Sequence, residues 1–274
     1  MPPVNETIQV ESAGARSRLS CFHRSGERST VVCLHGFGST KEDYTDLALH
    51  PAFAGRDLVF WDAPGCGQSI CDKPDLVSIP LLVDVVDQAL SKMQIQRCHL
   101  VGHSMGGLTA LQFATANPDR ILSFTNIEGN LAPEDCFLSR QIFDHPAETP
   151  QDFLNAFAAR VREKPEWSNR LYAANLPVKV HPDAVAPIFR SMVELSDHAP
   201  LLETFIDAPF PKMFVYGEQN SELSYIERLT RSGAEVAEIP SSAHFPMYSN
   251  PQELWSRLAQ FIDRCDQNDM DVRQ

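Results

Sequence analysis

A serine within a short glycine-rich motif is the first candidate for chemistry in this sequence. Residues 101–107 read Val-Gly-His-Ser-Met-Gly-Gly, so Ser104 occupies a G-x-S-x-G pattern that follows an apolar run and precedes a segment of helical period. Gly102 and Gly106 permit the sharp strand-to-helix turn that raises a serine hydroxyl above a sheet. Ser104 is therefore the predicted nucleophile of an acyl-transfer reaction. The N–H of Met105, at the helix start, is a predicted donor to the developing oxyanion.

Two other motifs contain the partners that a nucleophilic serine needs. A serine hydroxyl does not attack unaided because its pKa is too high, so a neutral imidazole must take its proton. His244, in Pro-Ser-Ser-Ala-His-Phe-Pro after the last predicted strand, stands where this base is expected. The loop His-Gly-Phe-Gly at 35–38 follows an earlier strand, and the N–H of Phe37 is the predicted second oxyanion donor. His35 is expected to brace this loop rather than to act as a base.

Alternating strands and helices position these motifs. Runs rich in β-branched and aliphatic residues alternate with segments of helical period, which is typical of βαβ units in a mostly parallel sheet. The predicted strands are 30–34, 58–61, 98–101, 122–127, 212–216 and 235–239, and the clearest predicted helices are 79–93, 107–116 and 251–265. Each of the three motifs follows directly after one of these strands.

One region of about 70 residues breaks the alternation. From about Leu131 to Leu202 no convincing strand is present, and the proline and aromatic residues suggest several short helices. Because a structureless loop of this length is improbable, we expect a helical insertion over the carboxyl ends of the strands, where ligands bind in open α/β sheets. The sequence thus predicts an α/β core from 1–130 and 203–274 and a helical insertion from 131–202.

Candidate substrate contacts come from this insertion and from the motifs. They are Phe137, Phe143, Trp167 and Phe189 in the insertion and Gly36, His103 and Phe245 in the motifs. The alternative for each aromatic residue is that it packs the insertion onto the sheet, since most buried aromatic side chains belong to a core.

The composition argues against several classes of function. The 274 residues include 23 Lys+Arg and 36 Asp+Glu, a formal net charge of −13, and such an acidic surface disfavours nucleic-acid and membrane-surface binding. The seven cysteines form no CxxC pair, so free thiols in a reducing cytoplasm are expected. The amino terminus lacks the features of a signal peptide, and no apolar stretch has the length of a membrane helix. No His, Cys, Asp and Glu cluster has metal-ligand spacing.

Four motifs in order give a resemblance to a known family. HGFG, WDAPGCGQS, GHSMGG and SSAHFP resemble the α/β-hydrolase superfamily, and the resemblance covers the chain from about residue 30 to 265. It implies a largely parallel, twisted sheet of about eight strands flanked by helices. It further implies a helical cap inserted after the sixth strand, a Ser–acid–His triad and no cofactor.

The acid of this triad departs from the commonest pattern of the family. Most relatives place an Asp after the seventh strand, about three residues beyond a Gly, but this sequence has Asn220 there. Some relatives place the acid after the sixth strand, and here Glu128 ends an apolar run at that point. Glu128 is therefore the expected acid, with Glu218 as the alternative. The structural alternative for Glu128 is that its carboxylate caps the start of the insertion.

These residues favour a cofactor-free serine hydrolase whose small-molecule substrate is a carboxylic ester or lactone of medium-sized apolar or aromatic character. Carbon–carbon bond hydrolysis, a lyase reaction or a peroxidase reaction could use the same triad, because the triad sets the nucleophile and not the substrate. A ligand receptor that does not hydrolyse its ligand is a further alternative. The oligomeric state, monomer or homodimer, is not readable from the sequence.

Overall fold

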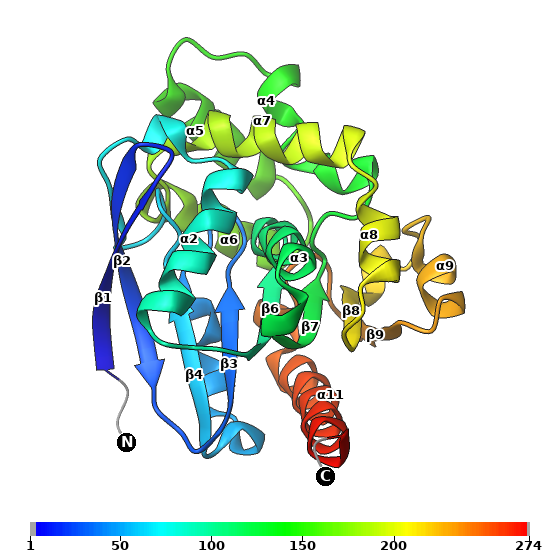
Figure 1. Cartoon of the computed structure of the whole chain (residues 1–274). Coiled ribbons are helices and arrows are strands. Elements are labelled where there is room, and N and C mark those ends of the chain that lie inside the picture. The colour runs from blue at the N-terminus through cyan, green and yellow to red at the C-terminus, as the bar shows by residue number, and fades with distance from the viewer. Residues whose placement is uncertain (1–3, 273–274) are drawn as a thin grey trace.

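A nine-stranded sheet carries the motifs, and the computed structural model describes residues 4–272 (Figure 1). Its strands are β1 (Val4–Ser12), β2 (Ala15–Arg24), β3 (Arg28–Leu34), β4 (Arg56–Trp61), β5 (Ile70–Cys71), β6 (Cys98–His103), β7 (Ile121–Ile127), β8 (Lys212–Gly217) and β9 (Glu235–Ile239). Their order is β1-β2-β4-β3-β6-β7-β8-β9, and β5 pairs with β2. The strands from β4 to β9 along this path are parallel, whereas β1, β2 and β5 pair antiparallel. This arrangement confirms the predicted fold class, with nine strands in place of about eight.

The amino-terminal strands are absent from the predicted set. β1 and β2 form a hairpin whose turn residues, Ala13 and Gly14, both have positive φ, 50° and 77°. Two such residues suit the tight turns that match the twist of hairpin strands. The sequence signal of β2 is weak because two of its inward-facing residues, Ala15 and Ser17, are small.

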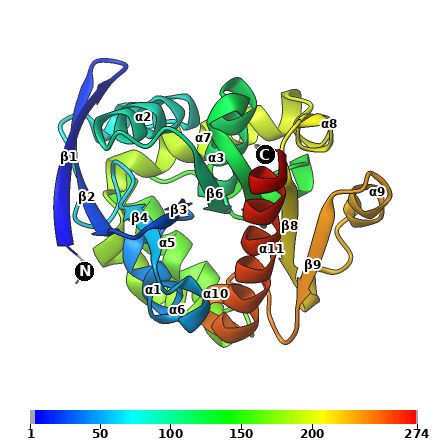
Figure 2. The ribbon, with the colours of Figure 1, turned by 60° about the horizontal axis from the view of Figure 1, so that its bottom comes forward.

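Helices cover both faces of the sheet. They are α1 (Thr45–Leu49), α2 (Ile79–Lys92), α3 (Met105–Ala116), α4 (Gln141–Asp144), α5 (Pro150–Arg162), α6 (Trp167–Lys179), α7 (Pro182–His198), α8 (Leu201–Asp207), α9 (Ile226–Arg231), α10 (Pro246–Ser249) and α11 (Pro251–Val272). Six short 3-10 helices are η1 (Lys41–Tyr44), η2 (Pro51–Phe53), η3 (Pro74–Leu76), η4 (Pro118–Arg120), η5 (Pro133–Phe137) and η6 (Glu218–Asn220). Helix α3 contacts α2 and α8 in one layer, and α1 contacts α11 in the other (Figure 2).

Helix α11 continues to Val272, beyond the predicted end at 265, because its polar face pairs with buried groups. Arg56 is fully buried, and its Nη2 contacts Asp263 Oδ1 at 2.5 Å and Asp266 Oδ2 at 2.8 Å. Asp266 Oδ1 also lies 2.9 Å from Nε2 of the buried His99. A buried guanidinium requires such partners. Asp263 and Asp266 on the polar face of α11 therefore hold this helix against the sheet.

The chain between β7 and β8 is mainly helical and contains η5 and α4 to α8. Figure 1 shows α4, α5 and α7 above the carboxyl ends of the central strands. The end of α6 is hydrogen-bonded to the turn after β4, since Gly67 N donates to Lys179 O and His181 N donates to Gly65 O. These bonds place the helical segment over the edge of the sheet at which the motif loops lie.

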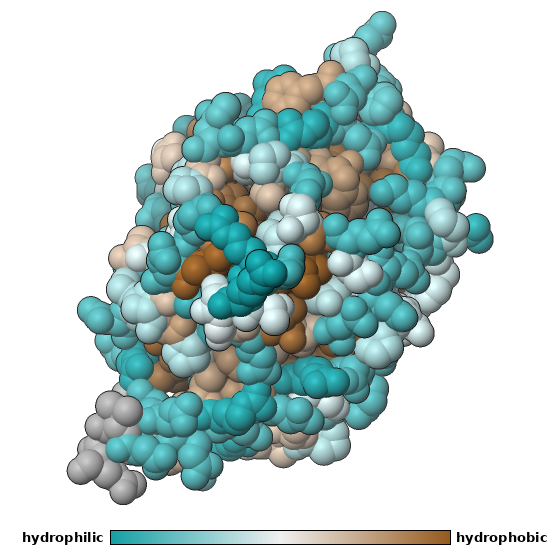
Figure 3. Space-filling view, turned by 90° about the vertical axis from the view of Figure 1, so that its right-hand side faces the viewer, coloured by the Kyte–Doolittle hydropathy of each residue, from teal (hydrophilic) through white to brown (hydrophobic). Residues whose placement is uncertain are grey.

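Apolar side chains form the core of the molecule, and polar side chains predominate on the face shown in Figure 3. The central parallel strands are buried on both faces, which explains their near-continuous apolar sequence. One side of the molecule is mostly hydrophilic, with hydrophobic residues visible mainly in depressions (Figure 3). Of the helices that the structure describes, none has the length and apolarity to cross a membrane.

Candidate active site

Ser104 lies in a strained turn between β6 and α3. Its φ is 51° and its ψ is −117°, and its N–H donates to Ile127 O at 3.0 Å. A positive φ at a residue other than glycine typically costs about 1–3 kcal/mol and is concentrated at functional sites. The flanking glycines are required by space, because a Cβ at Gly102 would lie 2.4 Å from Gly106 O and one at Gly106 would lie 2.2 Å from Leu34 O. The fold thus holds this serine in a conformation that the surrounding glycines make possible.

The loop after β3 lies directly against this turn. A Cβ at Gly36 would lie 3.1 Å from the Cβ of Ser104. His35 braces the loop, because its Nε2 accepts a hydrogen bond from Ala63 N at 2.9 Å and its Nδ1 donates to Gly36 O at 2.7 Å. Burial lowers the pKa of His35, so its ring is neutral.

Two backbone N–H groups beside Ser104 have no protein acceptor. Within the described part of the chain, the N–H of Phe37 and the N–H of Met105 make no hydrogen bond. Met105 is the first residue of α3, where the amide groups of a helix are unsatisfied and the helix dipole is positive. The two amides are therefore free to donate to an anionic oxygen at this point.

Glu128 follows β7 and contacts His244. The Oε2 of Glu128 accepts a hydrogen bond from His244 Nδ1 at 2.7 Å. Gly217 N donates to Oε1 at 2.8 Å, and Asn220 Nδ2 contacts Oε1 and Oε2 at 2.9 and 2.7 Å. Burial alone would raise the pKa of Glu128, but these hydrogen bonds and the nearby imidazole outweigh it, so the pKa lies below its ordinary value. The carboxylate is thus ionised although it is only 6% exposed.

The backbone at Glu128 is as unusual as that at Ser104. Its φ is 47°, and the turn is held by Asn126, whose Oδ1 accepts a hydrogen bond from Gly129 N at 2.6 Å. Gly129 lacks space for a side chain, because a Cβ there would lie 2.6 Å from Gly107 Cα in α3. Close packing of this turn against α3 therefore sets the position of the carboxylate relative to Ser104.

His103 lies behind His244. The Nε2–H of His103 donates to the carbonyl oxygen of His244 at 2.8 Å, and the two rings are 5.0 Å apart between centroids. Burial and the neighbouring His244 lower the pKa of His103 to about 3, so its ring is neutral. Its Nδ1 is buried without a hydrogen-bond partner. His103 thus supports the backbone of His244.

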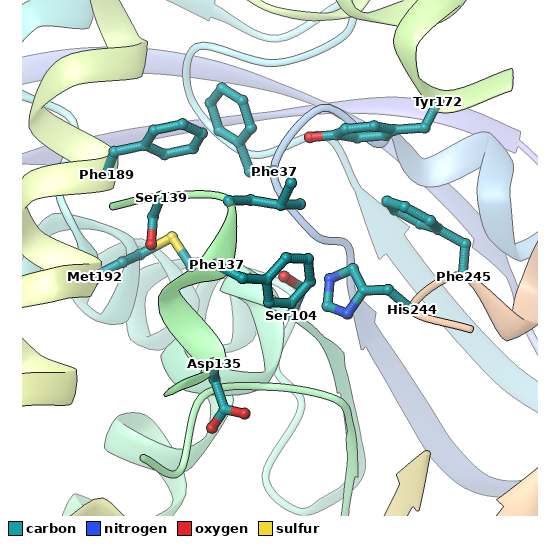
Figure 4. A pocket seen from close by; sticks show the side chains of 11 residues that line it. Phe37, Ser104, Asp135, Phe137, Ser139, Tyr172, Phe189, Met192, His244 and Phe245 are labelled. Atoms are coloured by element: carbon teal, nitrogen blue, oxygen red, sulfur yellow. The ribbon is translucent and has the colours of Figure 1, made fainter. Parts of the chain in front are cut away.

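Ser104 and His244 line one cavity between the sheet and the helical segment (Figure 4). The other lining residues are Phe37, Asp135, Phe137, Leu138, Ser139, Tyr172, Phe189, Met192 and Phe245. The free space is only about 10 Å³, which is room for roughly one water molecule. No hydrogen bond joins Ser104 Oγ to His244 in this state, and such bonds are often long until a substrate is bound.

The structure separates the sequence-predicted substrate contacts into three groups. Phe137, Phe189 and Phe245 line the cavity. Phe143 and Trp167 lie outside this lining, with 56% and 55% exposure. Gly36 and His103 lie next to Ser104 and His244 rather than in the lining. The alternative acid, Glu218, accepts a hydrogen bond from Ser241 N, whereas His244 Nδ1 is hydrogen-bonded to Glu128.

Several lining residues have no signal in the sequence. Asp135, Ser139, Tyr172 and Met192 belong to no motif, and only the packing of η5, α6 and α7 brings them to Ser104. Asp135 accepts hydrogen bonds from two backbone amides and from Tyr225, yet burial raises its pKa to about 6.

Comparisons with known proteins identify the family to which the chain is similar. Residues 31–257 match the model of the alpha/beta hydrolase family. A pimeloyl-[acyl-carrier protein] methyl ester esterase of Aeromonas salmonicida is 26% identical over 87% of this chain and 97% of its own length. Some other curated relatives are matched over only 28% or 50% of their length. Among the described residues, no group of three or more His, Cys, Asp or Glu side chains is arranged to hold a metal ion.

Solved structures share the fold. A thermophilic esterase from Thermogutta terrifontis has a TM-score of 0.75 and 16% identity, and the match covers 95% of this chain and 99% of that one. An N-acyl homoserine lactonase has a TM-score of 0.72 and 16% identity, over 96% and 98% of the two chains. At this identity the likeness concerns the fold alone.

Proposed function

Because this chain belongs to the alpha/beta hydrolase family, we propose that it is a serine hydrolase of small, uncharged carboxylic esters or lactones. The observation that carries the proposal is the line of contacts from a carboxylate through an imidazole toward a serine in a strained turn. Glu128 binds Nδ1 of His244, and His244 shares a cavity with Ser104. This is the arrangement that nucleophilic acyl transfer requires.

In the proposed first step, Ser104 Oγ attacks the acyl carbon while His244 Nε2 takes the hydroxyl proton. The hydrogen bond from Nδ1 to Glu128 keeps Nε2 unprotonated and ready to accept. The imidazolium that forms is stabilised by the buried carboxylate. The N–H groups of Phe37 and Met105 would donate to the oxyanion of the tetrahedral intermediate.

To complete acylation, His244 gives its proton to the leaving oxygen, and the C–O bond of the ester breaks. Water then attacks the acyl-enzyme with His244 again as the base, which releases the acid and restores Ser104. In a lactone the leaving alcohol stays attached to the acyl group. None of these steps needs a cofactor.

The cavity supports an apolar substrate. Phe37, Phe189 and Phe245 contribute ring surface, and the first two rings pack at 4.4 Å between centroids. Asp135 is the one acidic residue among the lining residues, and no Lys or Arg is among them, so a carboxylate on the substrate would find no partner. We further propose that residues 131–202 act as a cap whose side chains select the substrate.

The test is hydrolysis of a panel that contains p-nitrophenyl esters, neutral lactones and a vinylogous diketone. We expect turnover of esters or lactones that is lost by a factor of at least about 10⁴ in Ser104→Ala. Ser91→Ala, an exposed serine in α2, is the matched control and should retain full activity. Cleavage of the diketone alone would favour carbon–carbon bond hydrolysis instead, and equal activity of Ser104→Ala would reject the mechanism.

A further inference from the structure

A buried hydroxyl at one end of the cavity has no hydrogen-bond partner among the described residues, 4–272. Ser139 is 2% exposed and lines the cavity, and its Oγ makes no hydrogen bond. Buried hydroxyl groups in proteins are nearly always hydrogen-bonded, because burying one without a partner is unfavourable. An unpaired hydroxyl in a substrate cavity differs from one in a closed core, since a ligand can reach it.

The surroundings of Ser139 are apolar. Figure 4 shows Ser139 beside Met192 and Phe189, at the end of the cavity away from Tyr172 and Phe245. These neighbours offer no side-chain group suited to a strong hydrogen bond with the hydroxyl. Ser139 follows η5, whose Phe137 packs edge-on against His244 at 5.0 Å, so the same short segment touches both the reacting end and the far end.

From this position we propose that Ser139 is a specificity-determining residue that binds a neutral oxygen of the substrate, such as a hydroxyl or keto group remote from the scissile bond. The inference rests on the proposed hydrolase function and names a feature of its substrate. A neutral group is favoured because a charged one would be desolvated in this apolar end without an ionic partner. A serine hydroxyl both donates and accepts, so it can bind either kind of oxygen.

A matched pair of substrates tests this assignment. The parent is p-nitrophenyl 3-phenylpropanoate, and its partners carry one ring hydroxyl at the ortho, meta or para position. In the wild type we expect kcat/KM for the best hydroxylated ester to exceed that of the parent about fivefold, the usual size of one net hydrogen bond. In Ser139→Ala the ratio should fall to about one. No preference in the wild type for any isomer, or a preference that survives in Ser139→Ala, would overturn the proposal.

Thr125→Val is the control. Thr125 in β7 is 1% exposed and also has an unpaired buried hydroxyl, but it does not line the cavity. The variant removes a comparable hydroxyl and should keep the wild-type ratio. A lower ratio in Thr125→Val would mean that general changes in packing alter selectivity, and the assignment to Ser139 would fail.

Stability separates a ligand contact from a structural one. If Ser139 lacks a partner in the free protein, Ser139→Ala should keep or raise the free energy of unfolding, as Thr125→Val should. A marked loss of stability in Ser139→Ala alone would indicate a structural partner such as a buried water and would overturn the proposal.

A binding measurement distinguishes failure of this proposal from failure of the hydrolase function. If the wild type cleaves no ester or lactone, the proposed function is rejected, yet 4-ethylphenol and ethylbenzene can still be compared as ligands. The shift in melting temperature should be larger for the phenol, and this difference should vanish in Ser139→Ala. Equal shifts in the wild type would reject the role of Ser139 independently of catalysis.

Discussion

Replacing Glu128 with Gln changes one atom but removes both a charge and an acceptor. The carboxylate takes hydrogen bonds from Gly217 N, Asn220 Nδ2 and His244 Nδ1. The single oxygen of a Gln side chain can serve Gly217 and Asn220, which leaves its NH₂ facing His244. His244 must then accept at Nδ1 and carry its proton on Nε2, the tautomer that cannot receive the proton of Ser104.

The size of the effect follows from the same contacts. Two unit charges about 4 Å apart at an effective dielectric constant of about 20 interact by about 4 kcal/mol, which is about 10³ in rate. The wrong tautomer adds to this loss, and the amide substitution in a known Ser–His–Asp triad lowers kcat by about 10⁴. We therefore expect kcat of Glu128→Gln to fall by a factor between about 10³ and 10⁴.

The assay is steady-state hydrolysis of the best p-nitrophenyl ester, with circular dichroism to establish that the variant is folded. Glu218→Gln is the matched control, because Glu218 is bound to Ser241 N rather than to His244. It should stay within about threefold of the wild type. A Glu128→Gln enzyme with more than about a tenth of wild-type kcat, or an equal loss in Glu218→Gln, would refute the assignment of the acid.

Three further predictions concern residues around this pair. Asn220→Ala removes the Nδ2 hydrogen bonds to both carboxylate oxygens of Glu128, so the carboxylate should be held less firmly against His244 and kcat should fall about 10- to 100-fold. A kcat within about threefold of the wild type would contradict this. His103→Gln keeps a donor near the carbonyl of His244 but removes an imidazole whose pKa is about 3 in the folded and about 6.5 in the unfolded protein. Because only the unfolded wild type takes up this proton between pH 6 and 4, the variant should lose roughly 1 kcal/mol less folding stability per pH unit than the wild type in urea titrations over this range. The same slope in both proteins would count against this prediction. Phe137→Ala removes a 44% exposed ring that packs against His244. The ratio of kcat/KM for bulky esters to kcat/KM for acetate esters should therefore increase several-fold over that of the wild type. An unchanged ratio would show that Phe137 does not restrict access to the cavity.

The central part of the fold is predictable because it obeys short-range rules. Parallel strands buried on both faces have apolar runs, and β7 (Ile121–Ile127) differs by one residue from the predicted strand 122–127. The hairpin of β1 and β2 is not predictable in this way, since its inward-facing Ala15 and Ser17 give little hydrophobic signal. The end of α11 depends on a buried Arg56 far away in the chain, so local sequence cannot define it.

The same difference between local and long-range signals applies to the residues of the candidate site. Ser104 and His244 are predicted from the sequence because each lies in a short motif that follows a predicted strand, and the turn at Ser104 demands its flanking glycines. Glu128 needs a resemblance to be identified, since its contact with His244 spans 116 positions. Ser139 could not be identified from the sequence, because it stands out only through its buried hydroxyl, which has no hydrogen-bond partner among the described residues of the folded chain.

Covalent labelling of Ser104 tests the central claim, that this serine is an activated nucleophile. The protein would be treated with a fluorophosphonate probe, digested, and analysed by mass spectrometry for the modified residue. We predict stoichiometric labelling of the peptide that contains Ser104, with labelling abolished in Ser104→Ala and slowed at least about 10²-fold in His244→Ala. Absence of labelling in the folded wild type, or labelling at a different serine with Ser104 unmodified, would contradict the account.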